Sequence, residues 1–170
     1  MVLVGPMGAG KTTIGRYLAE QLGYVFRDTD SLIEERTGAA ISWIFDVEGE
    51  EGFRERESAL IRDLSGESGI VLATGGGAIL REHNRRVLSE MGTVVYLETS
   101  VREQLSRTRR DRKRPLLQAG DREEVLSELL TRREPLYREV ADVVVRTDRR
   151  GARNVAVEIL EQLARRSDHR

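Results

Sequence analysis

The chain has 170 residues, of which 39% are hydrophobic and 34% charged, a composition that fits a folded domain and excludes a disordered segment. Its 28 Lys and Arg against 29 Asp and Glu give a formal charge of -1, which argues against a dedicated nucleic-acid binder. With no cysteine, no apolar run of bilayer length and no secretory signal, we expect a cytoplasmic protein without disulfides or membrane partners, and a monomer.

Short apolar runs alternate along the chain with longer amphipathic segments, without internal repeats. The runs expected to form strands cover residues 2–4, 25–27, 70–73, 94–97 and 143–145. Most are rich in β-branched residues and apolar on both faces, which is typical of buried parallel strands. The expected helices cover residues 12–22, 50–64, 101–108, 122–137 and 154–166. This alternation predicts an α/β sandwich with right-handed crossovers, as a single domain over residues 1–170.

The first expected strand leads directly into a phosphate-binding motif. Residues 5–12 read Gly-Pro-Met-Gly-Ala-Gly-Lys-Thr, a complete G-x-x-x-x-G-K-[ST] between a strand and an amphipathic helix. The glycines let backbone N–H groups converge on phosphate oxygens at the N-terminus of the helix, whose dipole favours anions. Lys11 can reach the β- and γ-phosphates and the Thr12 hydroxyl can bind Mg²⁺. An ordinary glycine-rich turn would not explain the flanking pattern, so we expect a nucleoside triphosphate site.

Acidic residues and glycines follow the second and third expected strands, at the sheet edge where α/β proteins bind ligands. Asp28 and Asp30 come directly after residues 25–27, and their spacing lets one carboxylate face Mg²⁺ and the other an acceptor. A capping pair at the start of a helix is the alternative explanation. Residues 75–77 are three glycines, which permit a ligand to approach the backbone closely, although a flexible turn is also possible.

Three arginines lie in charged stretches where the sequence alone favours a surface position. Arg54, Arg114 and Arg133 have the chemistry to bind an anionic substrate with two hydrogen bonds each. Taken one at a time, each is better explained as a solvated residue, because runs of charge usually form exposed faces. The segment 107–122 is dense in charge and contains Pro115 and Gly120, which indicates a loop or a solvated helix end.

In their order and separations, these motifs resemble those of the shikimate kinases over nearly the whole chain. The residues that carry the resemblance are 5–12, Asp28-Thr29-Asp30, Phe53-Arg54 with Glu57, Gly75-Gly76-Gly77, Arg114-Pro115-Leu116-Leu117, and Arg133 with Pro135-Leu136-Tyr137. The resemblance implies a P-loop kinase fold like that of the nucleoside-monophosphate kinases, with a five-stranded parallel sheet and a mobile lid at about residues 109–121. It also implies transfer of the γ-phosphoryl group of ATP to the 3-hydroxyl of shikimate, in aromatic amino-acid (chorismate) biosynthesis.

The same resemblance implies roles for individual residues. Catalysis would depend on Lys11, Asp30 and Arg114. ATP would be bound by Gly8, Ala9, Gly10, Lys11, Thr12, Thr13, Arg107, Arg114 and Arg150. Shikimate would be bound by Asp30, Arg54, Gly75, Gly76, Gly77 and Arg133, with Phe45 and Phe53 as pocket walls. The Mg²⁺ cofactor would be held by Thr12, and by Asp28 through water.

Alternatives to this assignment differ in the acceptor or in the presence of catalysis. Another small-molecule P-loop kinase, such as a gluconate kinase, could also use Arg54 and Arg133 for a carboxylated polyol. A silent ATP-binding regulatory module should have lost Lys11, Thr12 or Asp30, and all three are present. One departure from the family pattern is Gly151-Ala152, where a proline that packs on adenine is common.

Overall fold

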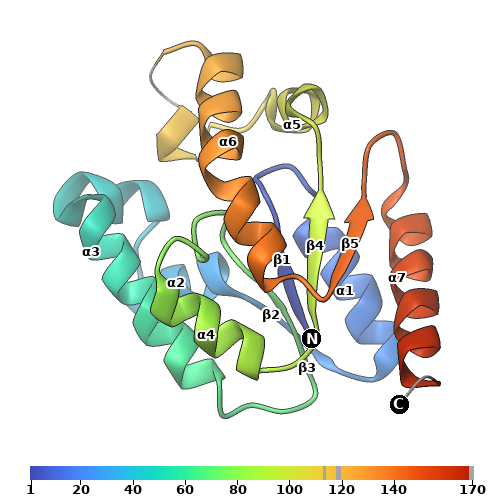
Figure 1. The fold of residues 1–170 in the computed structure, drawn as a ribbon. Helices are drawn as coiled ribbons and strands as arrows, with labels where there is room; N and C mark the ends of the chain where they lie inside the picture. The colour runs from blue at the N-terminus through green and yellow to red at the C-terminus, as the bar shows by residue number, and fades with distance from the viewer. Residues whose placement is uncertain (113, 118–119, 169–170) are drawn as a thin grey trace.

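The computed structural model describes residues 1–112, 114–117 and 120–168. Five parallel strands form one sheet in the order β2-β3-β1-β4-β5 (Figure 1). They are β1 (Val2–Val4), β2 (Val25–Asp28), β3 (Ile70–Ala73), β4 (Val94–Glu98) and β5 (Val143–Arg146). All five lie where the sequence predicts strands. Because the strands are parallel, their carboxyl ends meet at one edge of the sheet, where the phosphate-binding loop follows β1, Asp28 ends β2 and the three glycines come after β3.

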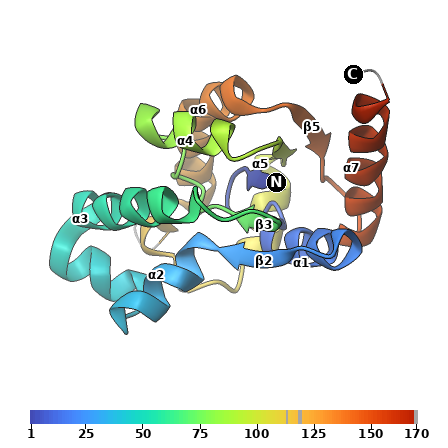
Figure 2. The ribbon, with the colours of Figure 1, turned by 90° about the horizontal axis from the view of Figure 1, so that it is seen from below.

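Helices cover both faces of the sheet, which gives the expected three layers (Figure 2). One face is covered by α1 (Lys11–Leu22) and α7 (Ala152–Ser167), and the other by α3 (Ile41–Leu64), α4 (Glu82–Glu90) and α6 (Arg122–Val140). The remaining helices are α2 (Thr29–Thr37), α5 (Val101–Thr108) and the short 3₁₀ helix η1 (Pro115–Leu117). In the part of the chain that is described, no helix combines the length and the apolar character needed to cross a bilayer.

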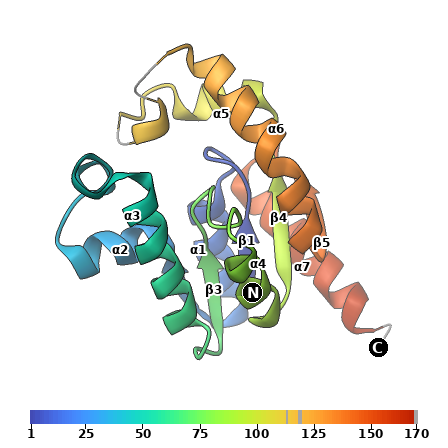
Figure 3. The ribbon, with the colours of Figure 1, turned by 60° about the vertical axis from the view of Figure 1, so that its left-hand side comes forward.

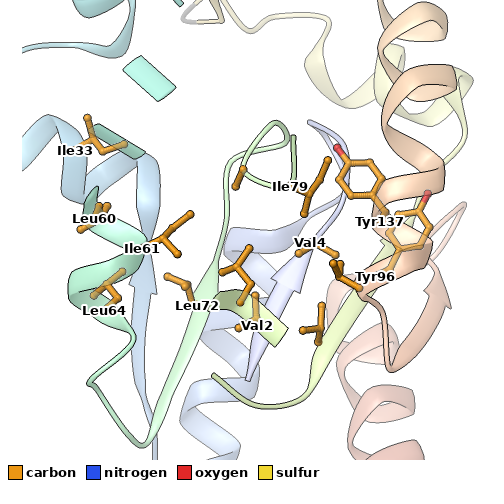
Figure 4. Close-up of a cluster of buried hydrophobic side chains, with 14 of the residues drawn as sticks. Val2, Val4, Ile33, Leu60, Ile61, Leu64, Leu72, Ile79, Tyr96 and Tyr137 are labelled. Atoms are coloured by element: carbon orange, nitrogen blue, oxygen red, sulfur yellow. The ribbon is translucent and has the colours of Figure 1, made fainter. Parts of the chain in front are cut away.

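The strands divide the core into two clusters because successive side chains point to opposite faces. Val2 and Val4 pack toward α3, α4 and α6, whereas Leu3 between them packs toward α1 and α7. Figure 4 shows the first cluster, in which the buried stripe of α3 faces Leu72 of β3. That stripe contains the residues that the periodicity places together, namely Phe53, Glu57, Leu60, Ile61 and Leu64.

The structure differs from the sequence prediction mainly where few apolar residues are buried. The helices α2 and α4 were not predicted, because α2 buries only Ile33 among its apolar residues and α4 only Leu88. The edge strands β2 and β5 are not buried on both faces; β2 has no buried residue and β5 alternates. Helix α3 starts well before residue 50 and is broken at Gly49, where φ is 72° and ψ 177°.

Candidate active site

The phosphate-binding loop connects β1 to α1 through a backbone conformation that favours glycine. Gly5, Gly8 and Gly10 have positive φ angles of 151°, 77° and 89°. A Cβ atom on Gly5 would lie 2.8 Å from the carbonyl oxygen of Leu97, so the loop also passes too close to β4 for a side chain. Gly10 caps α1 without a side-chain hydrogen bond, which leaves the first N–H groups of the helix for an anion.

Lys11, the first residue of α1, folds back over this loop. Its Nζ atom donates hydrogen bonds to the carbonyl oxygens of Gly5 and Pro6, both at 2.7 Å. Burial, and after it the positive charge of Arg114, lowers the pKa of Lys11 to about 7. This half-buried ammonium donates to neutral carbonyl oxygens, and a bound polyphosphate would place negative charge beside it, so the loop and its lysine are suited to bind an anion.

A cavity of about 220 Å³ lies over the loop, and we call it the P-loop cavity. Its lining residues are Gly8, Gly10, Lys11, Thr12, Thr13, Asp28, Asp30, Ala73, Thr74, Gly75, Gly76 and Arg114. Three of the residues expected to bind ATP do not line it: Ala9, Arg107 and Arg150. Ala9 is fully buried and packs in the core beneath the loop.

The two arginines expected to flank the nucleotide have different surroundings. Arg107 on α5 donates from Nη1 to the carbonyl oxygen of Gly8 at 3.0 Å and from Nη2 to that of Thr147 at 2.7 Å. It therefore ties the phosphate-binding loop to the chain that follows β5. Arg150 lies farther along that chain and forms an ion pair with Glu158 of α7 at 2.5 Å. The structure brings Arg107 to the loop but does not bring Arg150 to the cavity.

The residues expected to hold Mg²⁺ contact each other. The Thr12 hydroxyl donates to Oδ2 of Asp28 at 3.0 Å, while Oδ1 of Asp28 accepts from the backbone N–H of Ser31 at 3.1 Å. Asp28 is thus the N-cap of α2, which confirms the capping explanation, and it also lines a cavity over the phosphate-binding loop; its role toward Mg²⁺ stays a prediction. A hydroxyl beside a carboxylate is the hard oxygen donor set that Mg²⁺ accepts when phosphates and waters complete its shell. These residues therefore fit the cofactor.

A second cavity, of about 230 Å³, adjoins the first, and we call it the arginine cavity. It brings together all the residues expected to bind the substrate, namely Asp30, Phe45, Phe53, Arg54, Gly75, Gly76, Gly77 and Arg133. Its other lining residues are Met7, Glu34, Ile41, Glu57, Asp111, Arg114, Pro115 and Leu116. The two cavities share Asp30, Gly75, Gly76 and Arg114. Ligands in the two cavities would therefore meet at these four residues.

Arg54 and Arg133 are buried, with 7% and 5% of their surface exposed, so the surface position that each sequence context favoured is wrong. Arg54 donates from Nη1 to Oε1 of Glu57 at 3.0 Å and from Nη2 to Oε1 of Glu50 at 3.3 Å. Its guanidinium also lies over the ring of Phe53, 5.2 Å from the centroid. These partners offset the cost of burying the charge. Arg114 is half-buried where it lines both cavities.

Glu57 is a site residue whose role the sequence did not reveal. It is completely buried, its Oε2 atom has no hydrogen-bond partner among the described residues, and burial raises its pKa to about 7 against the opposing charge of Arg54. Asp30 resembles it: burial, and after it the charge of Asp28, raises the pKa of Asp30, and its Oδ1 atom also has no partner there. A charged residue within the apolar stripe of α3 was the available signal for Glu57.

The three glycines after β3 make room for charged side chains. A Cβ atom on Gly75 would lie 3.0 Å from Oδ1 of Asp30 and equally close to Oε2 of Glu57. On Gly77 it would lie 2.4 Å from Nη2 of Arg54, and on Gly76 it would lie 3.2 Å from Nη1 of Arg133. The glycines thus admit a close approach of the protein's own carboxylates and guanidinium groups, and the approach of a ligand to them stays a prediction.

Tyr137 supports this glycine turn from below and was not expected among the site residues. Its hydroxyl donates to the carbonyl oxygen of Gly76 at 2.6 Å, and its ring stacks on Tyr96 with centroids 5.1 Å apart (Figure 4). Burial raises the pKa of Tyr137 to about 12, so the hydroxyl keeps its proton. Tyr137 lies one helical turn after Arg133 on α6, and this spacing was the signal for its position in the site.

The segment expected to form a lid, residues 109–121, lines the arginine cavity through Asp111, Arg114, Pro115 and Leu116, while its residues 113, 118 and 119 lie outside the described ranges. Its described part includes η1, whose Pro115 and Leu116 line the cavity and whose Leu117 is buried against Met7 and Leu126. The Nε atom of Arg114 lies 2.8 Å from Oδ2 of Asp111, which orients the guanidinium.

Known proteins resemble this chain over nearly its whole length. The family model described as shikimate kinase matches residues 7–164. The shikimate kinase of Chromohalobacter salexigens is 60% identical over 168 residues, which cover 99% of this chain and 93% of that protein. The solved shikimate kinase of Acinetobacter baumannii in complex with shikimate is 53% identical, with a TM-score of 0.95 and coverage of 97% and 92%.

A gluconokinase from Sinorhizobium meliloti has only 18% identity and a TM-score of 0.61, with coverage of 99% and 93%, and this likeness extends to the fold alone. The two levels of similarity show different things: the first group shares sequence and fold over nearly the whole chain, whereas the gluconokinase shares the fold. The chain belongs to the shikimate kinase family.

Proposed function

We propose that this chain is a shikimate kinase, which transfers the γ-phosphoryl group of ATP to the 3-hydroxyl of shikimate and supplies shikimate 3-phosphate for aromatic amino-acid biosynthesis. The observation that carries the proposal is the junction of the two cavities at Asp30, Gly75, Gly76 and Arg114. ATP in the P-loop cavity and shikimate in the arginine cavity would have their reacting groups at this junction. Transfer needs that contact more than it needs any covalent step.

On the nucleotide side, the residues provide positive charge and hydrogen-bond donors. The N–H groups of the phosphate-binding loop and Lys11 would hold the β- and γ-phosphates, for which Lys11 must leave the carbonyl oxygens of Gly5 and Pro6. Arg114 reaches the junction from the other side and would neutralise the charge on the transferring group. Arg107 would fix the loop through Gly8, beside the nucleotide.

Thr12 and Asp28 would hold Mg²⁺ on this side. The Thr12 hydroxyl would turn its lone pair to the ion, and Asp28 would act through water while its other oxygen keeps the N-cap of α2. Bound there, Mg²⁺ would supply positive charge beside the phosphates and so help to neutralise the charge that develops on them.

On the acceptor side, opposite charges would orient a carboxylated ring bearing hydroxyl groups. Arg54 and Arg133 would bind the carboxylate, because both guanidinium groups are buried and line the cavity. The unpartnered Oδ1 atom of Asp30 would accept the hydrogen bond of the attacking hydroxyl. Phe45 and Phe53, whose ring centroids are 5.0 Å apart, would cover the apolar face of the ring.

The transfer step follows from these positions. The hydroxyl oxygen attacks the γ-phosphorus in line with the bond to ADP, that bond breaks, and ADP leaves with its electron pair. The hydroxyl proton passes to Asp30, whose raised pKa makes it a better proton acceptor than an ordinary aspartate. Pro115 and Leu116 over the cavity would exclude water, which would otherwise accept the phosphoryl group.

The direct test is a coupled assay of ADP release with shikimate, gluconate and nucleoside monophosphates as separate acceptors. We expect turnover with shikimate and a product whose phosphorus NMR signal is that of a phosphate monoester on the ring. Turnover with another acceptor and none with shikimate would refute the substrate assignment. ADP release without any acceptor would indicate ATP hydrolysis and would refute transfer.

A further inference from the structure

Helix α3 is broken at Gly49 into two parts, and the proposed mechanism does not explain this break. The first part, residues 41–48, we call the arm; it carries Ile41 and Phe45 into the arginine cavity. The second part, residues 50–64, is the helix that holds Phe53, Arg54 and Glu57 against the sheet. Figure 3 shows the arm turned away from the axis of the rest of α3.

Contacts between the two parts exist only because of the break. Residues eight apart in an uninterrupted α-helix are about 12 Å apart along the axis. Yet the ring centroids of Phe45 and Phe53 are 5.0 Å apart, and Arg56 donates from Nε and Nη2 to the two carboxylate oxygens of Glu48 at 2.7 and 2.6 Å. Both pairs have a spacing of eight residues, so the chain folds back between them.

Two glycines allow the chain to fold back at the break. Gly49 has φ 72° and ψ 177°, a combination that is essentially restricted to glycine. A Cβ atom on Gly52 would lie 2.5 Å from the Cβ atom of Glu48, whereas side chains one turn apart in a regular helix have Cβ atoms about 5–6 Å apart. The absence of a side chain on Gly52 therefore lets Glu48 fold over it and reach Arg56.

We infer that the Gly49 break is a specificity-determining element for the acceptor, because it fixes the distance between the Phe45 wall and the polar side of the arginine cavity. Gly49 and the Glu48–Arg56 pair are positioning residues that act through Phe45 and touch no substrate. The polar side consists of Asp30, Arg54 and the glycine turn, which are held by other elements. The arm therefore sets how far the Phe45 wall lies from that polar side, and with it how thick a ring fits between them. This inference rests on the proposed function.

The primary experiment compares Gly49→Ala with Gly23→Ala. A Cβ atom at either position meets nothing within 4 Å and both residues have positive φ, so each variant adds backbone strain without a clash. We expect Gly49→Ala to raise KM for shikimate about fivefold to a hundredfold, with KM for ATP unchanged and kcat at saturating shikimate near wild type. Gly23 lies at the far end of α1, and its variant should leave both KM values unchanged.

A charge exchange tests the same inference without changing Gly49. Glu48→Arg and Arg56→Glu should each raise KM for shikimate, and the double variant should restore it because the pair is re-formed with its charges reversed. Wild-type KM for shikimate in Gly49→Ala and in both single variants would overturn the inference. So would an equal rise of both KM values, since it would show a general loss of structure. A wild-type protein inactive on shikimate would instead refute the proposed function, and this inference with it.

Discussion

The two sides of the active site are built in different ways. The P-loop cavity is built mainly around one continuous stretch, residues 5–13, whose backbone conformation and single lysine suit an anion; Asp28, Asp30, the turn after β3 and Arg114 complete its lining. The arginine cavity collects side chains from α2, α3, α6 and η1, together with the glycine backbone of the turn after β3. A continuous motif can bind phosphate in many proteins without defining an acceptor, whereas a distributed cavity defines the acceptor but depends on the packing of every element that contributes. Substitutions should separate these two kinds of dependence.

The largest effect is expected on the nucleotide side, from Lys11→Met. Loss of the ammonium should reduce kcat at least about a thousandfold with any acceptor, because the charge on the transferring group is no longer neutralised. The coupled assay measures this directly. Activity within tenfold of wild type would remove Lys11 from the mechanism.

Lys11→Met should lower activity but raise stability. A stability measurement therefore shows whether activity is lost because the charge is gone or because the protein unfolds. The folded protein lowers the pKa of Lys11 to about 7 from an unfolded value of 10.5, so the buried charge destabilises the ligand-free protein at and below pH 7. That penalty decreases as the pH rises from about 7 to 10.5. Denaturant unfolding should therefore show Lys11→Met more stable than wild type at pH 6, with the advantage declining by pH 10.

On the acceptor side, Arg54→Lys and Arg133→Lys should separate the two substrates. Lysine keeps the buried charge and leaves Glu57 with a cation, but it cannot form the paired hydrogen bonds of a guanidinium. We expect KM for shikimate to rise about tenfold to a hundredfold while KM for ATP stays within about twofold. The control is Arg36→Lys, in the exposed ion pair with Asp63, which should change neither KM. A parallel rise in KM for ATP would show that the two cavities are not independent.

The same division explains how much of the site could be read from the sequence. The P-loop was predictable because its residues are adjacent and their spacing alone specifies the chemistry. The strands were predictable because they are short apolar runs, and Asp28 because it directly follows one of them. The burial of Arg54 was not predictable, because Arg54 and Arg56 lie in the same charged stretch with one residue between them. Packing against Phe53, Glu57 and the glycine turn buries Arg54, whereas Arg56 is exposed.

The elements that sequence patterns missed share a physical reason. Helix α2 buries Thr29 and Ile33 alone and α4 buries Asn84 and Leu88 alone, so neither has the apolar stripe that identifies a helix. The break at Gly49 was invisible for a different reason, since a glycine in a charged helix can be tolerated in place or can end the helix. Its effect lies in contacts between residues eight apart, which no local pattern encodes.

A smaller effect should appear in the pH dependence of acceptor binding. Burial raises the pKa of Glu57 to about 7, so the charged form of Glu57 increases as the pH rises from 6 to 8. When charged, Glu57 competes with the acceptor carboxylate for Arg54. The charges of Asp30 and Arg133 also shift the pKa of Glu57. We expect KM for shikimate to be about threefold to tenfold lower at pH 6 than at pH 8, at saturating ATP. Steady-state kinetics across this range measure the ratio.

Glu57→Gln provides the comparison, because it is neutral at every pH. Its KM for shikimate should vary less between pH 6 and 8 than that of wild type. Stability gives a second readout. Because the folded protein raises the pKa of Glu57 from 4.5 to about 7, the contribution of Glu57 to stability is largest at low pH and is lost as the pH rises to about 7. The stability of Glu57→Gln should not show this decline. An equally steep KM profile in the variant would assign the dependence to Asp30 instead.

The smallest effect is expected from Tyr137→Phe, which removes one hydrogen bond behind the glycine turn. The phenylalanine ring keeps the stacking on Tyr96, so the change is confined to the hydroxyl that donates to the carbonyl oxygen of Gly76. A hydrogen bond of this kind contributes about 0.5–1 kcal/mol net, which corresponds to a rise of about twofold to fivefold in KM for shikimate. KM for ATP should change less, since Lys11 and the phosphate-binding loop do not contact this hydroxyl.

The matched control is Tyr96→Phe: the Tyr96 hydroxyl is buried but has no hydrogen-bond partner among the described residues, so its removal should leave KM for shikimate unchanged and stability equal or higher. Equal KM values in the two variants would mean that the Gly76 peptide is held by its glycine neighbours and the buried arginines alone, and the acceptor side would then depend on fewer elements than its packing indicates.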